Sequence, residues 1–142
     1  MSMQLDKVQP KNKTQLKQLI NYAFKHNIYD LNFIDTSEIT DMSLLFSNCM
    51  HNFDVSSWDV SNVTNMGYIF YHCKNFNCDL SNWDVSKVKN MNYMFYNCKN
   101  FNCNLSDWDI SNMTRWKNIF CGCDKITIPN WYKKLYIVKN KI

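Results

Sequence analysis

Two hydrophobic rhythms alternate along the middle of the chain, and the segment Leu80–Cys98 contains both. Its first part has the spacing L-x-x-W-x-V, whose last three positions alternate between apolar and polar residues as in a short strand. Its second part places apolar residues at steps of three and four, the period of one helix face: Val88, Met91, Phe95 and Cys98. The pattern predicts a short strand followed by a short helix.

The same pattern returns every 25 residues. Three similar segments begin at Val55, Leu80 and Leu105 and read VSSWDVSNVTNMGYIFYHC, LSNWDVSKVKNMNYMFYNC and LSDWDISNMTRWKNIFCGC. A degenerate copy, FIDTSEITDMSLLFSNC, begins at Phe33 and aligns with a shift of 24. Such a period is typical of a solenoid, because each unit leaves an apolar edge that only the next copy covers.

Strand and helix in one unit predict an α/β repeat solenoid. We expect a leucine-rich-repeat-like, right-handed coil of about four turns, with a short parallel sheet, short helices and helical caps at both ends. The caps are predicted from apolar residues at helical spacing, from Thr14 to about His26, with a Thr or Asn cap, and from Asn130 to about Val138. We expect one domain over 1–142, divided into an N-terminal cap (1–29), repeats (30–125) and a C-terminal cap (126–142).

The repeat also carries a family resemblance. The run L-S-x-W-D-V-S-x-V-x-N-M-x-x-M-F-x-x-C, matched most fully at Leu80–Cys98, resembles the repeat of bacterial surface proteins, the BspA-like leucine-rich repeats of the DUF285 type. The resemblance covers about residues 33–125 and implies a leucine-rich-repeat-like fold. It also implies a role in adhesion or host interaction, since members are mostly secreted or lipid-anchored. Residues 1–142 show no signal-peptide, lipobox or wall-anchor pattern, so we expect this chain to depart from the surface role of those members.

Composition and charge narrow the classes of function. With only two Gly, the chain lacks the material for a phosphate-binding glycine loop. The net charge of +4 divides into basic ends, residues 1–29 and 126–142, and a middle with seven basic and eleven acidic residues. This distribution is a poor match to nucleic-acid binders, which carry a basic stripe on the body. No apolar run is long enough to span a membrane. We therefore expect no nucleic-acid or membrane partner and a cytoplasmic protein, or a surface protein if the chain is a trimmed fragment.

Tyrosines recur at positions that the helical pattern turns outward. Tyr68 and Tyr71 in one repeat return as Tyr93 and Tyr96 in the next, and Leu44 takes the corresponding place in the first copy. Tyr offers a large contact area at a small cost in rotamer entropy, so an exposed Leu/Tyr surface favours protein binding. The alternative is that the rings pack on one another between coils.

A column of carboxylates follows the tryptophans: Asp35, Asp59, Asp84 and Asp109. Like charges about 5 Å apart repel by about 1 kcal/mol in water, so this register needs compensation. One interpretation is structural, with each carboxylate accepting backbone N–H groups of the turn that follows in Asp-x-Ser. The others are an acidic strip that binds a basic partner, and a calcium or magnesium site.

The remaining candidates favour a core role. The inward positions of Trp58, Trp83 and Trp108 predict buried rings, and the column Cys49/Cys73/Cys98/Cys123 is predicted to be core. Cys78 and Cys103 form a second column, in which a disulfide between adjacent coils is geometrically allowed and reduced thiols are favoured. A zinc site would mix repeat columns and lacks paired C-x-x-C spacing. The three His, at 26, 51 and 72, form no repeated pair with a nucleophile. We expect neither catalysis, nor a metal, nor a cofactor.

The sequence thus predicts a monomeric, non-enzymatic protein-binding repeat module whose partner is another protein. Two alternatives stay open. One is a small intracellular inhibitor of phage or mobile-element type, which occludes a host defence or nucleic-acid-processing enzyme. The other is an extracellular adhesion fragment of a larger surface protein.

Overall fold

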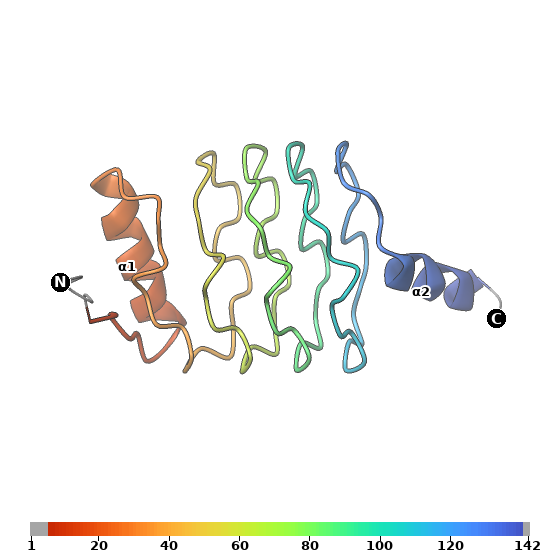
Figure 1. Ribbon diagram of the computed structural model, residues 1–142, viewed down its shortest axis with the longest axis horizontal. Coiled ribbons are helices and arrows are strands. Elements are labelled where there is room, and N and C mark those ends of the chain that lie inside the picture. Colours follow the sequence, from red (N-terminus) through yellow and green to blue (C-terminus); the bar gives the residue numbers. More distant parts are fainter. Residues whose placement is uncertain (1–5, 141–142) are drawn as a thin grey trace.

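The computed structural model describes residues 6–140, and parts of both predicted caps, residues 1–5 and 141–142, lie outside the described residues. Helix α1 (Lys13–Lys25) lies at one end of the molecule and helix α2 (Asn130–Asn140) at the other. Between them the repeats follow one another side by side along the long axis (Figure 1). Isolated parallel bridges link the same position of successive repeats, from Asp41 through Asn65 and Asn90 to Arg115.

The predicted α/β solenoid with a parallel sheet and a short helix in each repeat is wrong. Across residues 6–140 the regular elements are α1 and α2; no strand forms, and β pairing is confined to isolated bridges. The segment Leu80–Val85, which carries the strand pattern, instead contains a turn closed by the hydrogen bond from Trp83 N–H to Leu80 C=O. The Asp-x-Ser side chains cause this, because Asp79 and Asp84 take up the N–H groups of Ser81 and Ser86 that a strand would offer to its neighbour.

The expected helix in each repeat is replaced by tight turns. In the second repeat the N–H groups of Ile69 and Cys73 donate to the carbonyls three residues earlier, and each turn contains one residue with positive φ, at Tyr68 (59°) and His72 (58°). Left-handed residues four positions apart prevent a right-handed helix from continuing. The same places in the other repeats also have positive φ: Leu44, Asn48, Tyr93, Asn97, Asn118 and Gly122.

Stacked aromatic rings form the centre of the core. Phe46, Phe70, Phe95 and Phe120 follow one another with ring centroids 5.8, 5.5 and 5.7 Å apart and nearly parallel planes. A second row, which the sequence analysis did not single out, runs alongside: Phe53, Phe76 and Phe101. These rows bury the apolar edge of each repeat against the next, which is the main stabilising contribution in a chain with so little regular structure.

Tryptophan and cysteine tie the repeats together through shared backbone carbonyls. The indole N–H of Trp83 donates to Val55 C=O at 3.0 Å, and the same carbonyl accepts the backbone N–H of Trp58. Trp58, Trp108 and Trp131 repeat this bond to the carbonyl of the preceding repeat. The Cys98 thiol likewise donates to Phe70 C=O at 3.0 Å. Both lone pairs of each carbonyl are therefore used in a buried place. The predicted burial of the three central tryptophans is confirmed.

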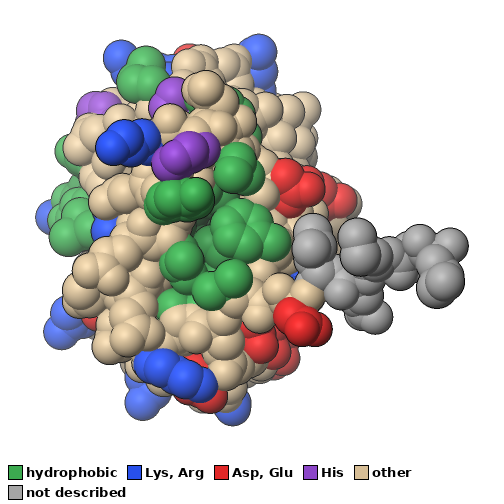
Figure 2. Space-filling view, turned by 90° about the vertical axis from the view of Figure 1, so that its left-hand side faces the viewer, with side chains coloured by type: hydrophobic (Ala, Val, Ile, Leu, Met, Phe, Trp, Pro, Cys, Tyr) green, Lys and Arg blue, Asp and Glu red, His purple; other side chains and the backbone are tan. Residues whose placement is uncertain are grey.

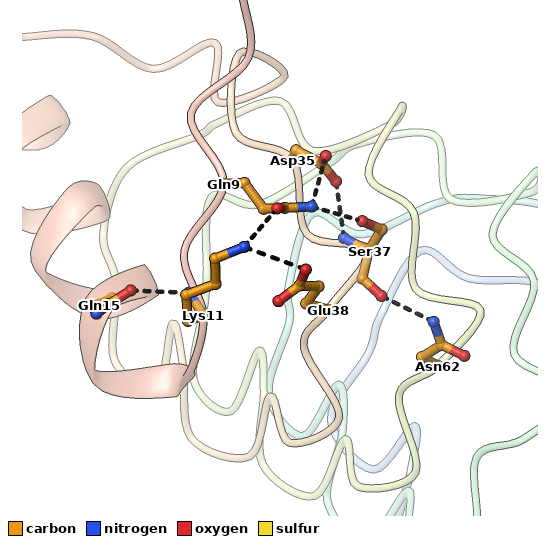
Figure 3. A network of polar contacts seen from close by, with 7 residues as sticks. All are labelled: Gln9, Lys11, Gln15, Asp35, Ser37, Glu38 and Asn62. Atoms are coloured by element: carbon orange, nitrogen blue, oxygen red, sulfur yellow. Dashed lines mark hydrogen bonds and ion pairs between the residues drawn. The ribbon is translucent and has the colours of Figure 1, made fainter.

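Helix α1 covers the first repeat. Leu16, Ile20 and Ala23 are buried against it, and the Asn12 side chain caps the helix by accepting the Gln15 N–H. A polar network fastens the segment before α1 to the same repeat (Figure 3). In it Gln9 donates to Asp35 Oδ2 at 3.0 Å, and Lys11 Nζ lies 3.2 Å from Glu38 Oε1.

Candidate functional site

The four tyrosines predicted at the surface come together as an array, here called the tyrosine array: Tyr68, Tyr71, Tyr93 and Tyr96. Tyr68 stacks on Tyr93 with ring centroids 4.9 Å apart, and Tyr71 stacks on Tyr96 at 5.3 Å. Within each repeat the two rings also contact each other, tilted at 5.3 Å and edge-on at 5.6 Å. The repeat spacing thus places the rings in two parallel pairs.

The rings are packed on one another and still face solvent. Each of the four tyrosines is half-buried. No hydrogen bond between described residues involves their hydroxyl groups, whereas the Tyr29 hydroxyl donates to Asn27 Oδ1. A stacked pair of rings with unpaired hydroxyls is a rigid surface that offers both apolar area and hydrogen-bonding groups to a partner. The structure therefore contains a part of each interpretation of the sequence: the rings pack on one another between repeats, and they are also partly exposed.

Leu44 extends the array toward α1 and Asn118 ends it toward α2. Both occupy the left-handed turn position of Tyr68 and Tyr93, with φ of 62° and 51°. Leu44 is 56% exposed, and its N–H donates to Gly67 C=O in the next repeat. On the other side Lys117 Nζ lies 5.8 Å from the centre of the Tyr93 ring, at cation–π distance. Leu44, Tyr68 and Tyr93 thus form one continuous row with a cation at its end.

The backbone under this row is costly for the residues that it carries. Positive φ suits Gly and Asn, and the last repeat has Asn118 at this place. Leu44, Tyr68 and Tyr93 hold large side chains in the same conformation, which a folded protein tolerates only where the surroundings impose it. Stacking of the two tyrosines compensates part of this cost. It does not account for Leu44, which is exposed.

The carboxylate column lies in turns, with the hydrogen bonds that the structural alternative predicts. Asp35, Asp59, Asp84 and Asp109 each accept the backbone N–H of the serine two residues later, at 3.0 Å. Hydrogen bonds from the hydroxyl and N–H of that serine lower the pKa of Asp35, Asp84 and Asp109. In the view along the repeats from the α1 end, most acidic side chains gather on one side of the molecule, beside the hydrophobic centre (Figure 2).

A second carboxylate row was missed in the sequence. Asp54, Asp79 and Asn104 accept the N–H of Ser56, Ser81 and Ser106 in the same way, and the thiols of Cys78 and Cys103 point at Asp54 and Asp79 at 3.6 and 3.5 Å. The signal was present, because each of the three full repeats contains two Asp/Asn-x-Ser motifs five residues apart. Because Asp and Asn serve alike at the first position of these turns, the motif acts by accepting backbone N–H groups and does not require a charge.

The remaining side chains that could take part in catalysis or metal binding have structural roles. Burial raises the pKa of the Cys73 and Cys78 thiols to about 12, so neither is a nucleophile near neutral pH. All seven cysteines are free. His51 packs between the rings of Phe24 and Tyr29. Within the described part of the chain no three metal-ligating side chains gather in one place. Neither α1 nor α2 combines the length and apolar character needed to cross a bilayer.

The turns stacked in register define this chain as a repeat protein, and the half-buried tyrosine array is an ordered aromatic surface on it. A family model described as "Mycoplasma protein of unknown function, DUF285" matches residues 14–131, and the chain belongs to this family. The predicted DUF285 membership is confirmed. Comparison with curated proteins and with solved structures gave no match.

Proposed function

We propose that this protein is a non-enzymatic protein-binding module whose contact surface is the tyrosine array together with Leu44. The observation that carries the proposal is the geometry of the array: four half-buried rings in two stacked pairs, with hydroxyls that bond to no described residue. Rigid tyrosines of this kind lose little rotamer freedom on binding, so their contact area converts efficiently into affinity.

Backbone conformation supports the same surface. Asn118 illustrates that the turn accepts the residue type preferred at positive φ, yet Leu44, Tyr68 and Tyr93 occupy the corresponding turn in the three preceding repeats. A large exposed side chain at a place where a small one costs less free energy points to a use outside the fold. The carboxylate column is less suited to the role, because one oxygen of each carboxylate is already used by its turn.

The partner is proposed to be another protein, and affinity capture tests this. The wild-type chain and two variants are used as bait in lysate of the native cell: one with all four array tyrosines changed to Ala, and one with all four changed to Phe. We expect a partner that the wild type retains and the Ala variant loses, while the Phe variant, which keeps ring stacking, retains it in part. Binding of the purified partner is then measured by calorimetry.

A matched control separates the array from the carboxylate column. Asp84→Asn and Asp109→Asn together remove two charges while keeping an acceptor for each turn, as Asn104 does in the second row. If this double variant loses the partner and the tyrosine Ala variant keeps it, the array is not the contact surface. A nucleic-acid-processing enzyme as partner would favour the inhibitor alternative within the same binding class.

A further inference from the structure

Hydrogen bonds between the tight turns of neighbouring repeats all point in one direction, whereas the bonds just before these turns, such as that from Lys89 N–H to Thr64 C=O, point the other way. In each repeat alternate N–H groups donate to carbonyls of the next repeat along the chain. Met91, Tyr93, Phe95 and Asn97 do so to Arg115, Lys117, Ile119 and Cys121, at 2.8 to 3.0 Å. The tight-turn part of the repeats therefore has polarity, with carbonyl groups presented at its first edge and N–H groups presented at its last.

The last repeat ends on donors without acceptors. Four N–H groups stand where the next set of bonds would begin, and no hydrogen bond between described residues uses them: Trp116, Asn118, Phe120 and Gly122. Phe120 is covered by Tyr132 of α2, whose ring meets it edge-on at 5.2 Å. Trp116 is half-buried and Asn118 exposed, so these two donors lie at the accessible part of the edge.

The two ends of the row of repeats are covered differently, by α1 at the first edge and by α2 at the last. At the first edge, Lys17 of α1 donates to Leu45 C=O at 2.6 Å, and Lys13 donates to the Ser43 hydroxyl at 2.8 Å. At the last edge, Trp131, Tyr132 and Leu135 of α2 pack on the core, but the following turn leaves it. Figure 1 shows α2 leading away from the last repeat, and Ile137 and Val138 are 54% and 63% exposed.

A cleft of about 460 Å³ lies between this diverging part of α2 and the last repeat. Trp116 and Val138 supply apolar walls, and Arg115, Lys117 and Lys139 supply cations around them. From residue 115 to residue 139 the chain holds six basic residues and one acidic residue. The cleft thus combines apolar walls and a positive rim with the unpaired N–H group of Trp116, and Asn118 follows two residues further along the same edge.

We propose that this cleft binds an extended, acidic segment of another protein. Carbonyls of that segment accept the N–H groups of Trp116 and Asn118, as the next repeat does elsewhere in the array, and its carboxylates face Arg115, Lys117 and Lys139. Addition of an extended chain to an open edge gives affinity through the backbone, and charge decides which chain is accepted. The site adjoins the tyrosine array, since Lys117 also lies beside the Tyr93 ring, but the proposal does not depend on the function proposed for that surface.

A second copy of this chain does not fit the cleft. Its own last edge carries the same unpaired N–H groups and the same cations, which repel those of the cleft. Its carbonyl edge is covered by α1 and by the ammonium groups of Lys13 and Lys17. A foreign segment avoids both obstacles, because an extended backbone offers carbonyls along its whole length.

Nitrogen-15 NMR of the full chain tests the proposal, with a short synthetic peptide that alternates glutamate with threonine as the probe. We expect the Trp116 and Asn118 amides to shift and to gain protection from hydrogen exchange at millimolar peptide. The double variant Arg115→Glu/Lys117→Glu, whose altered side chains are exposed, should weaken binding about tenfold. The control Lys25→Glu, which reverses one charge on α1 at the other end of the molecule, should leave binding unchanged.

Three outcomes would overturn the proposal. One is an absence of response at the two amides; another is equal binding of a peptide with lysine in place of glutamate. The third is that a single-stranded RNA oligonucleotide produces the same amide changes, which would make the cleft a general polyanion site. Tyr68→Ala/Tyr71→Ala should retain peptide binding, so failure of the cleft and failure of the tyrosine array are distinguishable.

Discussion

At the scale of single residues, the repeated Asp-x-Ser turn does what regular secondary structure does elsewhere: it satisfies backbone N–H groups. The Asp84 carboxylate accepts the N–H and the hydroxyl of Ser86 at 3.0 and 2.6 Å. Asn104 serves Ser106 with the same geometry in the second row. The turn therefore requires an acceptor oxygen, and a negative charge is not essential to it.

Asp84→Ala is expected to lower the free energy of unfolding by about 1 kcal/mol, because the Ser86 N–H loses its acceptor. Asp84→Asn should cost less than half of this. The folded pKa of Asp84 is lowered by Ser86, so the charged form is favoured in the folded state. Its stabilisation is complete above the unfolded pKa of about 3.9 and is lost as the pH falls through the folded pKa.

Urea unfolding of the three proteins at pH 6 and near pH 3 measures both effects. The wild type should lose more stability on acidification than Asp84→Asn does, since the amide does not titrate. Equal stability of Asp84→Ala and the wild type at pH 6 would mean that the turn does not depend on its side-chain acceptor.

At the scale of the repeat, backbone carbonyls that accept two hydrogen bonds explain why Trp and Cys recur at the same positions in successive repeats. Trp83→Phe removes the indole donor from Val55 C=O and leaves a small cavity among buried side chains. We expect a loss of about 2 kcal/mol in unfolding free energy, from one hydrogen bond and one incomplete ring. The Val55 carbonyl keeps the bond from the Trp58 N–H, which limits the cost.

Trp131→Phe is the matched comparison, since Trp131 makes the same bond to Leu105 C=O but is half-buried at the start of α2. It should lower the melting temperature less than Trp83→Phe does. Thermal unfolding followed by circular dichroism measures both. A larger effect at Trp131 would assign the stability of the array to its α2 end and away from the repeat-to-repeat bonds.

The sequence predicted which residues share a row, and failed on the backbone between them. Periodicity identifies equal positions, so the buried tryptophans and the adjacent tyrosines could be read directly. It could not identify the turns, because an i, i+3, i+4 pattern of apolar residues fits a helix and also fits consecutive tight turns. The decisive signal was conformational: Tyr68 and Tyr93 adopt positive φ, where neither Gly nor Asn marks the turn. The Asp-x-Ser motifs were recognised as possible turns, yet one of the two rows was overlooked.

At the scale of the whole molecule, the two ends differ in what closes them. Lysines of α1 meet the carbonyls at the first edge, while donors at the last edge remain unpaired among the described residues. A chain held together by contacts between neighbouring repeats opens first where a terminal repeat is least supported. Local opening should therefore begin at the last repeat, next to α2.

Cysteines distributed along the array report this opening, because alkylation needs an exposed thiolate. Burial raises the pKa of Cys49 and raises that of Cys123 to about 12, and both thiols are half-buried in end repeats. Cys73 is buried between them, whereas Cys121 is exposed. Under iodoacetamide at pH 8, we expect Cys121 to react first, then Cys123, then Cys49, and Cys73 last. Peptide mass spectrometry over time gives the order, and Cys121→Ser removes the fast background. If Cys49 reacts before Cys123, the α1 end is the weaker one, and the polarity of the backbone bonds does not set the order of opening.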